Sequence, residues 1–399
     1  MTCQRYRRPC RLRWQEPGDG PYSAPMGTKG MLDAAKVDAL IARARREVDD
    51  GLLPSAQVAL ARDGELIAFE AFGDATVDTR YVVFSCTKAF VAGAMWTLIG
   101  DGVVDVSKRV VEYVPEFDTN GKDVITVEQV MLHTGGFPHA PLGPPQWTTP
   151  AGRREAFAVW KLNWEPGSSY EYHPTSAHWV LSAIIENVTG ADFRDVVEDR
   201  VTGPAGLPRV LGIPPDEQGD IAEIVTVGEP ASPEEIKAAF GVDSLPVTEV
   251  TPEIILRFNE PSAREVGVPG GGAVMRACDL AMYYQALLHD EGRIWKPDVL
   301  ADVTGNVRNR LPERWTGIPA NRSLGLILAG DDGYSQVRGL GRTVSPGAFG
   351  HPGAGGQLAW ADPATGLSLG YTTNGYDLHV VREPRRCTAI SSLAAVCVE

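Results

Sequence analysis

The spacing of hydrophobic residues predicts two helices near the start of the chain. One helix, over residues 32–50, has apolar side chains on a single face, at Val37, Leu40, Ile41, Ala44 and Val48. The other covers residues 87–99 and is apolar on every side, which is typical of a helix buried in a core. Gly100-Asp101-Gly102 ends it, because glycine commonly follows the last turn. Weaker helical patterns cover residues 153–161, 176–200 and 277–290.

Strand patterns lie near both ends of the chain. Residues 56–61 and 65–72 read as a hairpin, because Asp63-Gly64 between two strand-like runs favours a tight turn. Further strands are predicted at residues 81–84, 323–329, 357–360 and 367–373. Residues 377–397 are expected to form a closing helix that is interrupted at Pro384. The pattern over 201–265 is too weak to assign.

This order of elements predicts an α/β fold in which a helical region is inserted into a sheet domain. We expect residues 31–84 and 320–399 to form the α/β sheet domain and residues 85–319 to form a mainly helical domain. Residues 1–30 are rich in Arg, Pro and Gly and have no apolar segment, so we expect a disordered N-terminal extension without a secretory signal.

Composition excludes some classes of partner. A formal net charge of -14 disfavours nucleic acid and anionic membranes, which require basic surfaces. No apolar run reaches the length of about 18 residues that a membrane-spanning helix needs. The six cysteines show no C-x-x-C spacing, so we expect free thiols and a cytoplasmic location. The oligomeric state cannot be predicted.

Candidate chemistry begins at the N-terminus of the buried helix, in Ser85-Cys86-Thr87-Lys88. Positions i and i+3 share a helix face, so the Lys88 amine can reach the Ser85 hydroxyl. A buried lysine loses proton affinity and can activate a serine nucleophile. No G-x-S-x-G or H-E-x-x-H sequence occurs, and His173 and His178 have the wrong spacing to share a metal. We therefore expect neither a metal nor a cofactor.

Five segments together resemble the serine β-lactamase and penicillin-binding-protein superfamily, specifically its class C-like branch, which includes family VIII-type carboxylesterases. The resemblance covers roughly residues 32–380 and implies a β-lactamase-like antiparallel sheet flanked by helices, with the active site between the two domains. The segments, in order, are Ser85–Lys88 (S-x-x-K), Leu132–Pro138, Pro166–Tyr172, Gly270–Leu280 and Gly350–Gly356.

Two positions depart from the lactamase pattern. Pro174 stands where lactamases have the asparagine that binds the amide of a β-lactam, and His351 stands where they have a lysine. A histidine is mostly neutral at pH 7, so the fixed positive charge near the substrate carboxylate is expected to be missing. Both changes weaken recognition of an anionic amide and leave acyl transfer intact.

The resemblance implies specific roles. Ser85 would be the nucleophile, Lys88 would tune its proton transfer, and Tyr172 would act as general base and then acid, with its pKa lowered by the nearby ammonium. Which of Lys88 and Tyr172 takes the proton first stays open. Tyr170 is the alternative to Tyr172, whose distance from Pro166-Gly167 fits the family better.

Further roles concern the transition state and the substrate. The backbone amides of Ser85 and Ala354 would form the oxyanion hole. His351, Gly353, Phe137 and Trp147 are candidate substrate-binding residues, although Phe137 and Trp147 could instead pack the loop that carries them. His133 is expected to be structural.

The predicted function is therefore a serine hydrolase of the carboxylesterase type that acts on a small-molecule ester. A β-lactamase, a D-Ala-D-Ala peptidase and an acyltransferase would use the same three side chains, and a non-catalytic binding protein would not need them.

Overall fold

A computed structural model describes residues 30–244 and 250–399, so the expected extension over residues 1–30 lies almost wholly outside the described residues. A six-stranded sheet has the order β2-β1-β9-β8-β7-β6, and every neighbouring pair is antiparallel. The α/β class and the antiparallel sheet are confirmed. The strands of this sheet are β1 (Ser55–Arg62), β2 (Glu65–Gly73), β6 (Ile327–Leu328), β7 (Phe349–Gly350), β8 (Leu358–Asp362) and β9 (Leu367–Thr373).

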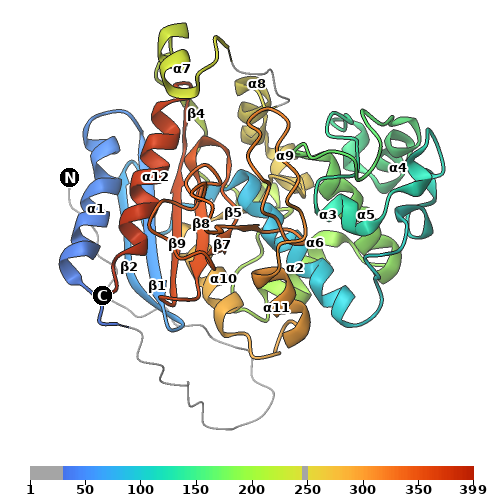
Figure 1. Cartoon of the computed structure of the whole chain (residues 1–399), viewed down its shortest axis with the longest axis horizontal. Helices are drawn as coiled ribbons and strands as arrows, with labels where there is room; N and C mark the ends of the chain where they lie inside the picture. The colour runs from blue at the N-terminus through green and yellow to red at the C-terminus, as the bar shows by residue number, and fades with distance from the viewer. Residues whose placement is uncertain (1–29, 245–249) are drawn as a thin grey trace.

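Both faces of the sheet are covered by helices (Figure 1). On one face α1 (Ala34–Asp49) and α12 (Arg382–Ala395) lie side by side and bury apolar side chains against the strands. On the other face lies α10 (Ala277–His289), which approaches β9 so closely that a Cβ on Gly370 would stand 2.0 Å from the Ala277 carbonyl oxygen. The expected helical region 85–319 therefore contains one helix that packs on the sheet.

Most of the other helices build the second part of the molecule, with α3, α4 and α5 at the right of Figure 1, whereas α7 lies at the top, above β4. The first is α2 (Thr87–Gly100), whose side chains from Thr87 to Leu98 are all buried, as its composition predicted. The others are α3 (Val127–Met131), α4 (Pro150–Val159), α5 (Ser176–Thr189), α6 (Phe193–Val197), α7 (Pro233–Phe240), α8 (Pro252–Leu256), α9 (Pro261–Val266) and α11 (Pro297–Gly305). Two short sheets pair β3 (Tyr81–Val82) with β5 (Val274–Met275) and β4 (Val225–Val227) with β10 (Gly375–Asp377).

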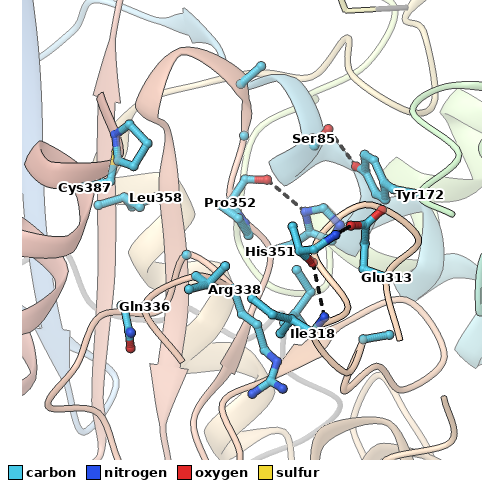
Figure 2. Close-up of a pocket in the computed structure, with 18 of the residues that line it drawn as sticks. Ser85, Tyr172, Glu313, Ile318, Gln336, Arg338, His351, Pro352, Leu358 and Cys387 are labelled. Carbon is cyan, nitrogen blue, oxygen red and sulfur yellow. Dashed lines mark hydrogen bonds between the residues drawn. The ribbon is translucent and has the colours of Figure 1, made fainter. Parts of the chain in front are cut away.

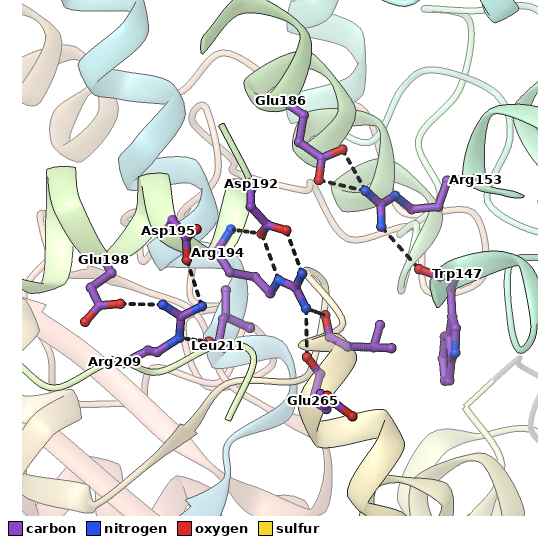
Figure 3. A network of polar contacts seen from close by, with 11 residues as sticks. Trp147, Arg153, Glu186, Asp192, Arg194, Asp195, Glu198, Arg209, Leu211 and Glu265 are labelled. Carbon is purple, nitrogen blue, oxygen red and sulfur yellow. Dashed lines mark hydrogen bonds and ion pairs between the residues drawn. The ribbon is translucent and has the colours of Figure 1, made fainter. Parts of the chain in front are cut away.

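An ion pair and a hydrogen bond to a backbone carbonyl join helices of this second part (Figure 3). The guanidinium of Arg153 on α4 donates to both carboxylate oxygens of Glu186 on α5, at 2.7 Å each. Arg194 on α6 donates to the Glu265 carbonyl on α9 at 2.8 Å. These contacts fix α4 against α5 and α6 against α9.

Three predicted elements were wrong in their extent. The helix expected over 176–200 is interrupted, because Gly190 takes a left-handed φ of 72° and ends α5. The strand expected over 323–329 is reduced to Ile327–Leu328, because Gly325 turns the chain with φ 106°. Pro384 does not interrupt α12, since it lies in the first turn, where its missing N–H has no intrahelical partner to lose.

Candidate active site

Ser85 lies in a tight turn that joins β3 to the buried helix α2. The turn is a 3-10 segment, Phe84–Cys86, which continues directly into α2. Phe84 has a left-handed φ of 44°, a conformation that costs a non-glycine residue about 1–3 kcal/mol. Its ring is buried and packs edge-on against Phe258 at 5.6 Å, which holds the turn in place. The Ser85 side chain is thereby presented at the N-terminal end of a rigid helix.

Ser85 has two polar partners in the structure. The Lys88 amine lies 3.1 Å from the Ser85 Oγ, and the Tyr172 hydroxyl donates to the same oxygen at 2.9 Å. Figure 2 shows the Ser85 and Tyr172 side chains facing each other across this bond. The three side chains predicted from distant segments of the sequence therefore meet at the Ser85 Oγ.

The amine of Lys88 is enclosed by carbonyl oxygens. Lys88 is 0% exposed, and its Nζ donates to the Pro174 carbonyl at 2.6 Å and to the Gly270 carbonyl at 2.5 Å. Burial, and next the charge of Arg322, hold the pKa of Lys88 well below its ordinary value. The same nitrogen contacts the Ser85 Oγ at 3.1 Å. Loss of one proton from the ammonium would leave two N–H groups for the two carbonyls and a lone pair for the Ser85 hydroxyl.

The expectation for the pKa of Tyr172 was wrong. Burial raises the pKa of the Tyr172 phenol, and this effect outweighs the opposing influence of Arg322 and of the hydrogen bond to Ser85. The charge that opposes the shift comes from Arg322 and not from the Lys88 ammonium. Tyr172 is therefore a protonated hydroxyl that donates to Ser85.

Two buried histidines support the segment that carries Tyr172. The His133 Nδ1 accepts from the His173 backbone N–H at 3.2 Å, and the His173 Nε2 accepts from the Phe137 N–H at 3.1 Å. The His133 ring lies 4.8 Å from the Tyr172 ring. Burial lowers the pKa of His173 to about 3, so the ring is a neutral acceptor. His133 has the structural placement that the sequence suggested.

A cavity of about 550 Å³ opens beside Ser85 and Tyr172. His351, Gly353 and Ala354 line it, from the loop between β7 and β8. A Cβ on Gly353 would stand 2.3 Å from the Val83 carbonyl oxygen, so only glycine allows this loop to approach the Ser85 turn. Ala354 follows and begins the short helical turn Ala354–Gly356.

His351 is buried at the side of the cavity. Its ring lies 5.9 Å from the Tyr172 ring, and its Nδ1 is 2.9 Å from the Pro352 carbonyl oxygen, as Figure 2 shows. Burial, followed by the charges of Arg322 and Lys88, holds the pKa of His351 well below its ordinary value. The neutral ring donates from Nδ1 to that carbonyl and leaves Nε2 as an acceptor.

Phe137 and Trp147 lie away from the cavity. Phe137 is fully buried and packs against Phe117 and Trp160 at 5.9 Å each. Trp147 lies beside Trp179 at 6.5 Å, and its carbonyl accepts from Arg153 (Figure 3). Both aromatic rings complete the core around α4 and α5, so the structure does not bring them to the other candidate site residues.

Sequence reasoning missed Arg322. Its guanidinium lines the cavity, 5.0 Å from the Tyr172 ring, and donates through Nε to the Tyr170 hydroxyl at 2.9 Å. Tyr170 is thereby occupied, and it is Tyr172 that reaches Ser85. Arg322 belongs to none of the recognised motifs, so no feature of the sequence marked it. The positive charge thought to be missing beside His351 is present on this arginine.

The structure describes residues 30–244 and 250–399, and two kinds of feature are absent from that part of the chain. In that part of the chain no group of three or more His, Cys, Asp or Glu side chains is arranged to hold a metal ion. None of its helices is both long and apolar enough to cross a bilayer.

Comparison with known proteins identifies a family and a fold. The family profile described as Beta-lactamase matches residues 38–387. Esterase/beta-lactamase LipL of Mycobacterium tuberculosis is 28% identical over 321 residues, which are 75% of this chain and 70% of LipL.

Two solved structures share the fold. A penicillin-binding protein homologue from Caulobacter crescentus has a TM-score of 0.73 at 23% identity, covering 92% of this chain and 99% of its own. A family VIII carboxylesterase has a TM-score of 0.72 at 24% identity, covering 91% and 99%. The profile match spans most of the sequence, and the chain therefore belongs to the beta-lactamase family.

Proposed function

We propose that the protein is a serine hydrolase that cleaves carboxylic esters through an acyl-enzyme on Ser85. The observation that carries the proposal is the position of the Ser85 Oγ, 3.1 Å from the Lys88 amine and 2.9 Å from the Tyr172 hydroxyl. A serine needs a base to become a nucleophile and a proton donor to release the leaving group. These two neighbours supply one each.

The opposite pKa shifts support a different role for each side chain. Lys88, with its pKa lowered by burial, takes the proton of the Ser85 hydroxyl as Oγ attacks the ester carbonyl carbon. Tyr172, with its pKa raised by burial, keeps its proton until it donates it to the departing alkoxide. Lys88 then returns a proton to Tyr172, and water releases the acyl group by the reverse sequence.

The amides of Ser85 and Ala354 are proposed to receive the negative charge of the tetrahedral intermediate. Both lie at the start of short helical turns, where backbone N–H groups have no intrahelical acceptor. Gly353 allows the second of these turns to approach the first. A preorganised donor of this kind is worth about 10²- to 10³-fold in kcat.

Esters are favoured over β-lactams by the residue two positions after Tyr172. Pro174 offers Lys88 a backbone carbonyl and has no side-chain amide with which to bind a lactam. The names of LipL, an esterase/beta-lactamase, and of the family VIII carboxylesterase support ester hydrolysis.

The test is hydrolysis of p-nitrophenyl acyl esters and of a chromogenic cephalosporin by the purified protein and by Ser85→Ala. We expect ester turnover that disappears in Ser85→Ala, with little cephalosporin turnover. Rapid cephalosporin cleavage would assign a β-lactamase instead, and ester turnover that survives in Ser85→Ala would overturn the proposal.

A further inference from the structure

The catalytic cavity extends as far as the first turns of α12, where Glu383 and Cys387 line its wall. Figure 2 shows Cys387 at the opposite side of the pocket from Tyr172, so α12 bounds the end that lies away from the proposed proton donor. A Cβ on Gly356 would stand 3.5 Å from the Glu383 Cγ. The Glu383 side chain therefore packs directly on the turn that carries the second proposed oxyanion donor.

The Glu383 carboxylate has no polar partner in the part of the chain that the structure describes. Its oxygens form neither a hydrogen bond nor an ion pair with any residue of 30–244 or 250–399. The other carboxylate in the wall of the cavity belongs to Glu313, which accepts from the backbone N–H groups of Trp315 at 2.9 Å and Thr316 at 2.8 Å. Of the two, Glu383 is the one whose capacity for a partner is unused.

The arginines next to Glu383 on α12 are engaged elsewhere. Arg382 donates to both carboxylate oxygens of Asp377, at 2.6 and 2.8 Å, and Arg386 donates to the same carboxylate at 3.1 Å. Arg386 also lies 3.9 Å from Glu47 on α1. Burial raises the pKa of Glu383 to about 7, an effect that outweighs the opposing charge of Arg386. The negative charge of Glu383 is therefore poorly compensated within the protein.

A poorly compensated carboxylate in a cavity wall favours a cationic ligand. Removal of a charge from water is costly unless a partner of opposite charge compensates it. The same wall includes the apolar side chains of Val337, Leu358 and Pro384, which suit the methyl groups of an alkylated ammonium. We infer that Glu383 is a cation-binding residue that selects esters bearing an ammonium group.

This inference rests on the proposed function, and the reaction is balanced by water alone. The acyl carbon bonds to the Ser85 Oγ, the bond to the alcohol oxygen breaks, and that oxygen leaves with the proton from Tyr172. Water then adds its hydroxyl group to the acyl carbon and returns a proton to the enzyme. An acid and an alcohol are released, and the ammonium group is unchanged.

Two pairs of esters test the inference at pH 8, where Glu383 is ionised. Acetylcholine and 3,3-dimethylbutyl acetate differ by nitrogen against carbon in the alcohol half. The p-nitrophenyl esters of 4-(trimethylammonio)butanoate and of 5,5-dimethylhexanoate differ in the same way in the acyl half. We define the cation preference as kcat/KM for the charged ester divided by kcat/KM for the neutral one. In at least one pair the preference of the wild-type protein should exceed that of Glu383→Gln by about tenfold or more, and that pair identifies the half of the ester that faces Glu383.

Glu313→Gln is the matched control, because it also removes a carboxylate from the wall of the cavity, but one that its own turn already binds. Its cation preference should stay near that of the wild-type protein. A wild-type preference no higher than that of Glu383→Gln in both pairs would overturn the inference. An equal loss in Glu313→Gln would overturn it as well, since the effect would then not belong to Glu383.

The cation preference of the wild-type protein should also fall between pH 8 and pH 6, as Glu383 takes up a proton. The titratable or charged groups that face Glu383 are Arg382, Arg386 and Cys387 on α12, and Tyr376 and Asp377 on β10. Both arginines stay charged over this range. Burial raises the pKa of Cys387 to about 12 and the pKa of Tyr376 above its ordinary value, whereas hydrogen bonds lower the pKa of Asp377 against the effect of burial. Glu383→Gln should show no such fall, and a fall of the same size in that variant would contradict the inference.

The stability of Glu383→Gln separates a binding role from a structural one. A carboxylate without a partner in the protein contributes no ion pair, so the midpoint of unfolding in urea should stay at or above that of the wild-type protein. A clearly lower midpoint, or a variant that does not fold, would show that Glu383 is an ion-pair partner of Arg386 and would overturn the inference. Ser85-dependent hydrolysis of 3,3-dimethylbutyl acetate tests the proposed function separately, since that ester has no charge.

Discussion

The Lys88 amine donates to the Gly270 carbonyl oxygen at 2.5 Å, across 182 residues of sequence. This contact joins α2 to the loop before β5 and fixes the amine beside Ser85. It requires glycine at position 270, because a Cβ there would stand 2.8 Å from the Pro174 carbonyl oxygen, the second acceptor of the amine. Gly270 therefore matters for both acceptors of Lys88: it supplies one carbonyl, and its lack of a side chain leaves room for the other.

Gly270→Ala should consequently lower kcat/KM for esters by about tenfold or more, since small displacements of a catalytic group are costly. Gly271→Ala is the matched control: its Cβ would meet its nearest neighbour at 3.6 Å, an ordinary contact, and its activity should stay near that of the wild-type protein. Steady-state kinetics with p-nitrophenyl butyrate measures both variants. Equal losses in the two variants would contradict the role given to Gly270.

The pH dependence of kcat/KM should follow Lys88. The neutral amine is the proposed base, so activity should rise with pH as Lys88 loses its proton. Because burial and then Arg322 lower the pKa of Lys88, the midpoint should lie well below the ordinary value of 10.5. Arg322→Gln removes a positive charge that lowers this pKa, so its midpoint should move to higher pH.

His351→Gln serves as the control for the pH profile. Burial holds the pKa of His351 well below 6.5, so the ring is neutral through the working range and its replacement should leave the midpoint in place. A midpoint at or above 10.5 in the wild-type protein, or a shift to lower pH in Arg322→Gln, would argue against Lys88 as the base.

Tyr172→Phe should lose more activity with poor leaving groups than with good ones. If the hydroxyl protonates the departing oxygen, the loss for alkyl acetates should reach about 10²- to 10⁴-fold. For p-nitrophenyl acetate, whose leaving group needs no proton, the loss should be smaller. Parallel kinetics with both substrates measures the difference, and equal losses would assign Tyr172 a positioning role alone.

The fold could largely be predicted from local patterns, because hydrophobic spacing reports which face of an element is buried. The hairpin of β1 and β2, the buried helix α2 and the helix α10 match their predicted ranges closely. Ser85, Lys88 and Tyr172 could be selected because they lie in motifs of fixed spacing, and the structure places them in contact.

The rest of the site depends on contacts that sequence spacing does not encode. Arg322 reaches the cavity because backbone bridges join it to Asn309 and to Ile327 on β6, and these bring it beside His351. Phe137 and Trp147 lie in the expected loop, but burial against neighbouring helices takes their rings into the core. The pKa of Tyr172 depends on burial, which only the folded chain reveals.

The ion pair between Arg153 and Glu186 should matter for stability and not for catalysis. Their side chains are 5% and 15% exposed, and removal of one partner from a buried pair costs about 3 kcal/mol. Glu186→Gln should therefore lower the free energy of unfolding in urea by about that amount, with kcat/KM unchanged. The control is Arg200→Gln, which leaves Asp101 without its ion-pair partner. The side chains of that pair are 39% and 49% exposed, so the cost in free energy of unfolding should stay below about 1 kcal/mol. Equal effects in both variants would show that burial of the first pair has no energetic consequence.

The most direct test of the account is mass spectrometry of the protein quenched during turnover of a p-nitrophenyl ester. We expect the intact mass to increase by one acyl group, peptide mapping to place that group on Ser85, and Ser85→Ala to show no adduct. An acyl group on another residue would contradict the account. So would a wild-type protein that shows no adduct together with a Ser85→Ala variant that still hydrolyses the ester.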